Sequence, residues 1–273
     1  MDTETYIQKL LEAEPLREPV LRAIVQALNL PAASRGLDAG CGIGLPALLL
    51  AEATGPKGHI TGLDILSEML SYGEKLAAQA GLSDRVTFQE GDIFARLPFA
   101  GKTFDWVWSM DCIGYPAGEI GPVLKELMRV VKPGGSIFIL AWSSQQILPG
   151  YPLLEARLNA SCSSYLPFLE GIPMEQHFLR APRRFEEAGL VEVKAQTFVG
   201  EAQAPLAKGV RTALVSLFGM LWGQPQPGTL PGDWAEYQQL CTPGSPGFIL
   251  DLPGYYAFFT CTLVQGKVPT GEV

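Results

Sequence analysis

The chain has 273 residues, 47% of them hydrophobic, so it is long enough to bury one large core. Its formal net charge of −8 argues against a nucleic-acid partner, since Arg183-Arg184 is the densest basic spot and is expected to be a solvated helix start. Five scattered cysteines form no C-x-x-C pair and are joined by only His59 and His177, so no metal site is expected.

The N-terminal segment is predicted to be helical. Residues 3–29 carry apolar residues at helical spacing, and Glu14-Pro15 predicts a break into two helices. The first residues, Met1 to Glu4, are acidic and lack the layout of a secretion signal, and no apolar run reaches the ~20 residues of a membrane helix. We therefore expect a cytoplasmic protein with reduced thiols and no membrane span.

Residues 36–44 are the most informative stretch of the chain. An apolar run ends at Asp38, and a helix-like apolar run, Leu45 to Ala53, follows the stretch. Between them, three glycines stand at alternate positions: Gly40, Gly42 and Gly44. Such glycines let a strand turn sharply into a helix and let a ligand approach the backbone. A dinucleotide-binding turn needs a third glycine where Leu45 stands, and Asp38 suits a cationic amino group better than a phosphate.

Two further predicted strands end in acidic residues. Residues 60–65 read as a strand that closes on Asp64, a position from which a carboxylate can take both hydroxyls of a ribose. Residues 86–93 end a third strand in Gly-Asp, which places Asp92 where it can accept a hydrogen bond from an adenine amino group.

The remaining pattern predicts a parallel sheet covered by helices on both faces. Residues 104–111 read as a fourth strand, in which Asp105 is expected to be structural. Residues 129–139 read as a helix end, a Pro-Gly-Gly turn and a fifth strand, and Ser67 is expected to cap an earlier helix. A short helix and two strands rich in β-branched and aromatic residues complete the pattern: residues 182–189, 190–199 and 255–264.

Two segments lie outside this pattern, at positions where a common core acquires its own substrate. Residues 145–180 hold aromatic residues among Pro, Ser and Gly, and residues 203–254 hold an apolar stripe at helical spacing from Leu206 to Trp222. We expect a partly mobile substrate lid, with a helix packed on the sheet or a homodimer surface as the alternatives for the stripe.

These motifs, in this order, resemble the class I S-adenosylmethionine-dependent methyltransferases, and most of all the small-molecule enzymes related to ubiquinone and menaquinone biosynthesis methyltransferases. The resemblance covers roughly residues 35–142. It implies a Rossmann-like α/β fold with seven strands in the order 3-2-1-4-5-7-6, the last antiparallel, and helices on both faces. The chain would then be a single methyltransferase domain, residues 1–273, with N-terminal helices in residues 1–30 and the cofactor-binding core in residues 35–142.

The resemblance also implies a role for individual residues. Asp38 would hold the methionine ammonium of the cofactor, Asp64 the ribose hydroxyls and Asp92 the adenine amino group. The methionine part and the sugar would lie along the backbone of Gly40, Cys41, Gly42 and Gly44. The adenine would be bordered by Ile65, Met69, Gly91 and Ile93, and the sulfonium end by Ser109, Met110 and Asp111.

The implied reaction is in-line methyl transfer to a small apolar or aromatic metabolite, with no metal. A general base is needed only if the acceptor keeps its proton, and the candidates are Asp111, Tyr115 and His177. His177 lies among apolar residues, where a structural role is the alternative. Two other functions stay open: a catalytically inactive cofactor-binding partner or regulator, and an NAD-dependent oxidoreductase, against which Leu45 and Asp38 both argue.

Overall fold

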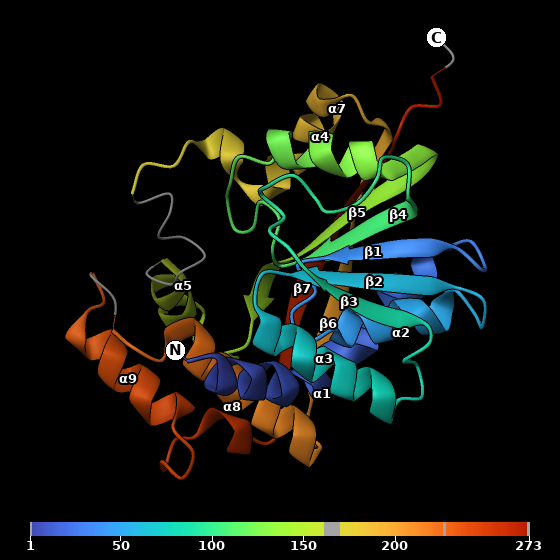
Figure 1. Cartoon of the computed structure of the whole chain (residues 1–273). Coiled ribbons are helices and arrows are strands. Elements are labelled where there is room, and N and C mark those ends of the chain that lie inside the picture. The colour runs from blue at the N-terminus through green and yellow to red at the C-terminus, as the bar shows by residue number, and fades with distance from the viewer. Residues whose placement is uncertain (1, 161–169, 226–227, 272–273) are drawn as a thin grey trace. The chain divides into compact units, whose positions relative to one another are not determined.

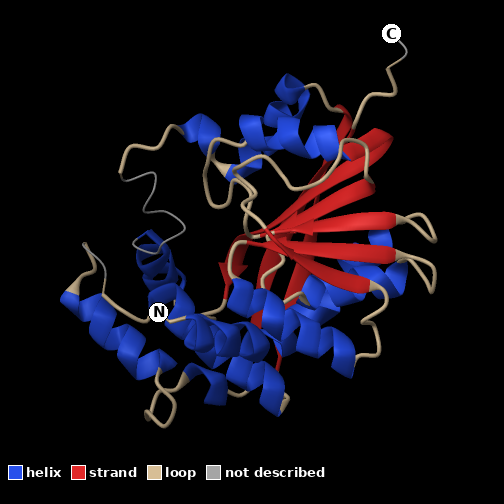
Figure 2. Ribbon diagram, in the orientation of Figure 1, coloured by secondary structure: helices blue, strands red, loops and turns tan. Residues whose placement is uncertain are grey.

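The computed structural model describes residues 2–160, 170–225 and 228–271, and a seven-stranded sheet organises them (Figures 1 and 2). The strand order is β3-β2-β1-β4-β5-β7-β6, which confirms the predicted order. The strands are β1 (Arg35–Ala39), β2 (His59–Asp64), β3 (Val86–Glu90), β4 (Phe104–Met110), β5 (Val131–Gln146), β6 (Val191–Gln203) and β7 (Tyr256–Lys267). β1 pairs in parallel with β2 and β4, β2 with β3, and β4 with β5.

Helices cover both faces of the parallel strands β1–β4. Figure 1 shows α2 and α3 on one face and α4 and α7 on the other. The helices are α1 (Thr3–Ala27), α2 (Leu45–Ala53), α3 (Ser67–Gln79), α4 (Gly121–Val130), α5 (Pro152–Ala160), α7 (Ala181–Ala188), α8 (Lys208–Trp222) and α9 (Pro231–Cys241). Within the described residues, three short 3₁₀ helices add to them: η1 (Met174–Gln176), η2 (Phe178–Arg180) and η3 (Ile249–Asp251).

The chain divides into two compact units, each built from segments far apart in sequence. The first comprises Met1–Val20, Trp142–Met174 and Val199–Cys261, and the second comprises Leu21–Ala141, Glu175–Phe198 and Thr262–Val273. Strands β1–β4 with α2, α3, α4 and α7 lie within the second unit. The two predicted insertions supply α5, α8 and α9 of the first unit.

Two local predictions were wrong. Helix α1 continues through both Pro15 and Pro19 instead of breaking at Glu14-Pro15. A proline removes one backbone hydrogen bond and bends a helix, but burial of side chains such as Leu16 and Val20 stabilises the continuous helix. Ser67 is the first residue of α3, not its cap. Leu66 holds the cap position and no side chain caps the helix, but the Leu66 N–H donates to Asp64 Oδ1 at 3.1 Å, so the strand-end carboxylate fixes the residue before the helix.

The predicted Pro-Gly-Gly turn is an irregularity inside β5. Phe104 pairs with Val131 but Trp106 pairs with Ser136, so residues 132–135 bulge opposite Asp105. Asp105 Oδ2 accepts the Arg35 N–H at 2.7 Å, and Oδ1 forms an ion pair with Lys132 at 2.7 Å. Asp105 is therefore structural, as predicted.

The packing of β1 against β4 depends on a glycine. The indole of Trp106 fills the space beside Gly36, where an added Cβ would lie 2.0 Å from the ring. Trp106 Nε1 donates to Ser34 Oγ at 2.9 Å, so the buried indole is also hydrogen-bonded. The two contacts hold the central strands in the register that places the candidate site.

Candidate functional site

The carboxyl ends of four parallel strands meet at one edge of the sheet in the second unit. Asp38, near the end of β1, pairs with Gly62 of β2 and Trp108 of β4. Asp64, the last residue of β2, pairs with Glu90 of β3. The residues that follow these strands therefore come to the same edge, where open α/β sheets bind their ligands.

The glycine loop turns sharply at this edge, because Gly40, Gly42 and Gly44 all have positive φ angles, of 78°, 53° and 76°. The N–H groups of Gly40 and Cys41 both donate to the Leu63 carbonyl of β2, at 2.8 and 2.9 Å. Helix α2 then begins at Leu45, directly after the loop, as predicted.

Phe88 of β3 packs beneath this loop, and sequence reasoning gave it no role. An added Cβ on Gly44, Gly62 or Gly73 would lie 2.7–2.9 Å from the Phe88 ring. Gly40 is restricted in the same way by Cys112, whose Sγ would lie 2.5 Å from an added Cβ. A strand residue that touches glycines of three different elements carries no local signal, so only the tertiary structure shows it.

Asp38 is a buried carboxyl group with an unsatisfied oxygen. It is 1% exposed, and its Oδ2 has no hydrogen-bond partner in the described structure. Burial raises the pKa of Asp38 to about 8, and the nearby negative charge of Asp64 contributes to the rise. A cationic ligand group at Oδ2 would supply both the missing hydrogen bond and the missing charge.

Asp64 is held in place by two backbone hydrogen bonds. Its Oδ2 accepts the N–H of Gly42 in the glycine loop at 2.8 Å, and its Oδ1 accepts the N–H of Leu66 at 3.1 Å. Each carboxylate oxygen can accept a further hydrogen bond. Asp64 is thus a fixed acceptor for two donors, such as a pair of hydroxyls.

Asp92 follows β3 and is exposed, with its Oδ1 accepting the Phe94 N–H at 2.8 Å. Ile65 and Phe94, which follow the neighbouring strands β2 and β3, are 59% and 67% exposed. Met69 and Ile93, by contrast, are 1% and 6% exposed. Ile65 and Phe94 therefore offer apolar surface to a ligand, whereas the Met69 side chain lies in the core. Sequence reasoning missed Phe94, although an aromatic residue two positions after Asp92 was a usable signal.

The end of β4 places further polar groups near this edge. Ser109 is fully buried and its Oγ has no hydrogen-bond partner in the described residues. Met110 ends the strand, and Asp111 follows with a φ of 49° while its N–H donates to the Leu140 carbonyl at 2.9 Å. A non-glycine residue at positive φ is uncommon and directs the chain away from the strand.

Two of the candidate bases lie close together beyond β4. The Tyr115 ring packs edge-on against the Phe178 ring, with centroids 6.4 Å apart. His177 forms an isolated antiparallel β-bridge with Ala117. His177 Nδ1 accepts the Leu179 N–H at 3.1 Å and so caps η2, and burial lowers the pKa of its imidazole. These contacts favour the structural alternative for His177.

Over the described ranges, no group of three or more His, Cys, Asp or Glu side chains could hold a metal ion. In the same part of the chain, no helix combines the length and the apolar character needed to cross a membrane.

The part of the chain that matches a known family contains the glycine loop and the strand ends described above. Residues 37–135 match a family described as a methyltransferase domain. The demethylmenaquinone methyltransferase of Bacillus velezensis is 33% identical over 195 residues, which cover 66% of this chain and 81% of that protein. Among solved structures, the YcgJ protein of Bacillus subtilis has a TM-score of 0.56 at 18% identity, covering 93% of this chain and all of that chain. A SAM dependent methyltransferase from Aquifex aeolicus has a TM-score of 0.52 at 21% identity, covering 72% and 90% of the two chains.

Replacing Asp38 with asparagine should stabilise the ligand-free protein as the pH rises. The pKa of Asp38 rises from 3.8 to about 8 on folding, so between these values the folded chain holds a proton that the unfolded chain has released. The free energy of unfolding then falls with pH in this window, by up to about 1.4 kcal/mol per pH unit from this group. Urea denaturation at several pH values should show an advantage of Asp38→Asn over wild type that grows toward pH ~8.

Asp105→Asn provides the control. Burial alone would raise the pKa of Asp105, but the Arg35 N–H and Lys132 outweigh that effect and lower it, so this variant should lose stability at neutral pH. Parallel stability curves for Asp38→Asn and wild type across the window would contradict the expectation for Asp38.

Proposed function

This chain belongs to the class I S-adenosylmethionine-dependent methyltransferases, and we propose that it transfers the methyl group in line to a small apolar or aromatic acceptor. S-adenosylmethionine is its cofactor, and its methyl acceptor is a small molecule. The observation that carries the proposal is the buried, unpartnered Oδ2 of Asp38 beside the glycine loop, which fits the ammonium group of the methionine part.

The other residues at the sheet edge fit the same cofactor. Asp64, fixed by the Gly42 and Leu66 N–H groups, suits the two ribose hydroxyls. The exposed side chains of Ile65 and Phe94 suit the two faces of the adenine, and Asp92 its amino group. We further propose that the methionine part and sugar follow the loop backbone, that Gly91 and the backbone of Ile93 border the adenine, and that the buried Met69 supports this side of the site from within the core. Ser109, Met110 and Asp111 would border the methyl donor end.

For this reaction the protein mainly has to align the acceptor with the methyl group of the cofactor. When bound, the cofactor supplies a methyl group on a positively charged sulfur, which departs as a neutral thioether. The chain's own task is to hold the acceptor atom in line with that methyl group and to exclude water. Asp111 stays the candidate at the donor end for accepting an acceptor's proton, because His177 already caps η2.

Exposed apolar side chains in the first unit support an apolar acceptor. Met174 and Leu230, one from each insertion, are 77% and 57% exposed. The same unit exposes large apolar side chains, among them Leu153 at 73%. We therefore propose that residues 145–180 and 203–254 provide the acceptor's binding surface. By name, the Bacillus velezensis relative acts on demethylmenaquinone, an acceptor of the proposed kind.

Incubation with isotope-labelled S-adenosylmethionine and a metabolite extract should label a small molecule that partitions into organic solvent. Mass spectrometry of the labelled product would then identify the acceptor and the methylated atom. Cofactor binding by calorimetry with no labelled product from any extract would favour the inactive binding protein. Binding of NADH in place of S-adenosylmethionine would favour the oxidoreductase and contradict the proposal.

Replacing Asp64 with alanine should weaken S-adenosylmethionine binding by about 1.5–3 kcal/mol, the range for hydrogen bonds to a charged group. Asp64→Glu should recover little, because the extra methylene moves the carboxylate away from the Gly42 N–H. Calorimetry would measure both dissociation constants, with Asp84→Ala, at an exposed position before β3, as the control. An unchanged dissociation constant in Asp64→Ala would reduce Asp64 to a partner of the loop backbone.

Addition of the identified acceptor should slow hydrogen exchange in residues 206–222, which include α8, because acceptor binding would order this segment. The measurement compares free, cofactor-bound and acceptor-bound protein at two protein concentrations. If protection follows protein concentration and ignores the ligands, the segment is a dimer surface and the lid proposal fails.

A further inference from the structure

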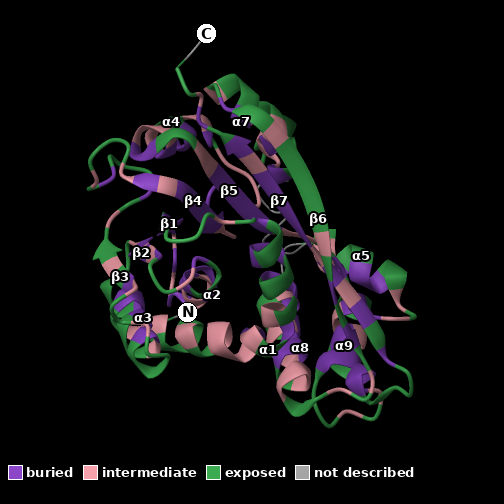
Figure 3. Ribbon diagram, turned by 90° about the vertical axis from the view of Figure 1, so that its right-hand side faces the viewer, coloured by how far each residue is buried: buried purple, intermediate pink, exposed green. Residues whose placement is uncertain are grey.

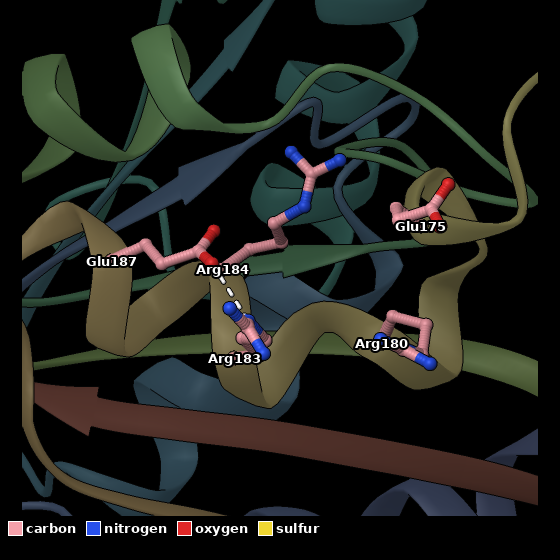
Figure 4. Close-up of a pocket in the computed structure, with 5 residues that line it drawn as sticks. All are labelled: Glu175, Arg180, Arg183, Arg184 and Glu187. Carbon is pink, nitrogen blue, oxygen red and sulfur yellow. Dashed lines mark hydrogen bonds and ion pairs between the residues drawn. The ribbon is translucent and has the colours of Figure 1, made fainter.

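A cavity with a volume of about 400 Å³ opens beside α7, away from the proposed cofactor residues (Figure 4). Five residues line it, and none of them belongs to the proposed cofactor set: Glu175, Arg180, Arg183, Arg184 and Glu187. We call this cavity the arginine pocket. Its volume lies within the range of about 300–1,000 Å³ that is usual for small-ligand pockets. The sequence marked Arg183-Arg184 only as a solvated helix start, yet the structure gathers three arginines around one space in a chain of net charge −8.

The guanidinium groups of the arginine pocket keep hydrogen-bond donors to spare. Arg183 Nε donates to Glu187 Oε1 at 2.7 Å, and an Arg184 amino group donates to Glu119 Oε1 at 3.3 Å. Arg180 forms no ion pair with any residue that the structure describes. Because each guanidinium carries five N–H donors, these contacts leave most of the donors available.

The combined field of the three arginines already acts on a carboxylate. The hydrogen bond from Arg183 lowers the pKa of Glu187, and the positive charges of Arg183, Arg184 and Arg180 lower it further. All three arginines thus act on the same carboxylate, and Arg183 has the largest effect.

The backbone that carries these side chains is held firmly. The Phe178 N–H donates to the Pro116 carbonyl at 3.1 Å, and the Gly118 N–H donates to the Gln176 carbonyl at 3.2 Å. Phe178 and Phe185 are 4% and 0% exposed, so both ends of the segment are anchored in the core. Arginines on a fixed backbone lose less conformational entropy when they bind a ligand.

We propose that the arginine pocket binds a phosphate group, carried either by a soluble phosphate ester or by a lipid headgroup. A guanidinium group can donate two parallel hydrogen bonds to two oxygens of one phosphate. Three guanidinium groups together offer more donors than one carboxylate can accept. The carboxylates of Glu175 and Glu187 stand in the same wall, so a ligand with a single weak charge competes poorly for Arg183. A phosphate monoester, with close to two negative charges, competes better.

The test uses the full chain and two probes. Calorimetry with inorganic pyrophosphate reports a soluble phosphate, and sedimentation with phosphatidylcholine vesicles that contain phosphatidic acid, a lipid with a phosphate monoester, reports a lipid headgroup. Wild type should bind at least one probe, and the probe that binds identifies the source. The double variant Arg180→Gln/Arg184→Gln should bind that probe at least tenfold more weakly. Arg22→Gln, which alters an exposed arginine paired with Glu52 at 2.8 Å, should bind as wild type.

A third variant keeps the test decisive if the double variant does not fold, as judged by loss of S-adenosylmethionine binding. Glu187→Gln removes the carboxylate that competes for Arg183 and should tighten probe binding severalfold. Failure of wild type to bind either probe would overturn the proposal. Equal binding by wild type and the double variant, or no tightening in Glu187→Gln, would do the same and reveal adventitious binding only.

Discussion

The rest of the candidate site depends on two carboxyl groups that lie near each other at one edge of the sheet, those of Asp38 and Asp64. Asp38 is buried with an unpartnered oxygen, and the charge of Asp64 adds to the rise of its pKa to about 8. A buried carboxylate without a partner costs stability, and the fold retains this one where a cationic ligand group would offset the cost. Asp64 is instead satisfied by backbone N–H groups from Gly42 and Leu66, so it keeps its position without a ligand.

The glycine loop follows from the same constraint. In this loop the Gly42 N–H donates to Asp64, and the Gly40 N–H donates to the Leu63 carbonyl. The positive φ angles of the glycines allow the backbone to make both hydrogen bonds. Phe88 then fills the space that side chains at Gly44 and Gly62 would occupy. At Gly44, the turn of the loop and the packing of Phe88 thus both require glycine, for different reasons.

Methyl transfer depends more on alignment than on reactive side chains, which agrees with the contacts of the candidate bases. His177 serves as a cap for η2, and Tyr115 packs against Phe178. Under the proposed function, specificity for the acceptor would come from the segments added to the common core, residues 145–180 and 203–254. The arginine pocket lies in a different part of the chain, on α7 and the turn before it, and extends the chemistry of the molecule from a cationic cofactor group to a phosphate.

The sequence by itself determined the order of the strands' acidic ends and the start of α2 at Leu45, because runs of apolar residues, glycines and strand ends are local properties. Its two local errors, a break at Pro15 and a cap at Ser67, arose where packing and a strand-end carboxylate outweighed a local preference. Only the tertiary structure decided three further matters: that Met69 is buried while Phe94 is exposed, that Asp38 lacks a partner, and that three arginines share a cavity. Burial, missing partners and cavities depend on residues far apart in the chain, which no local pattern records.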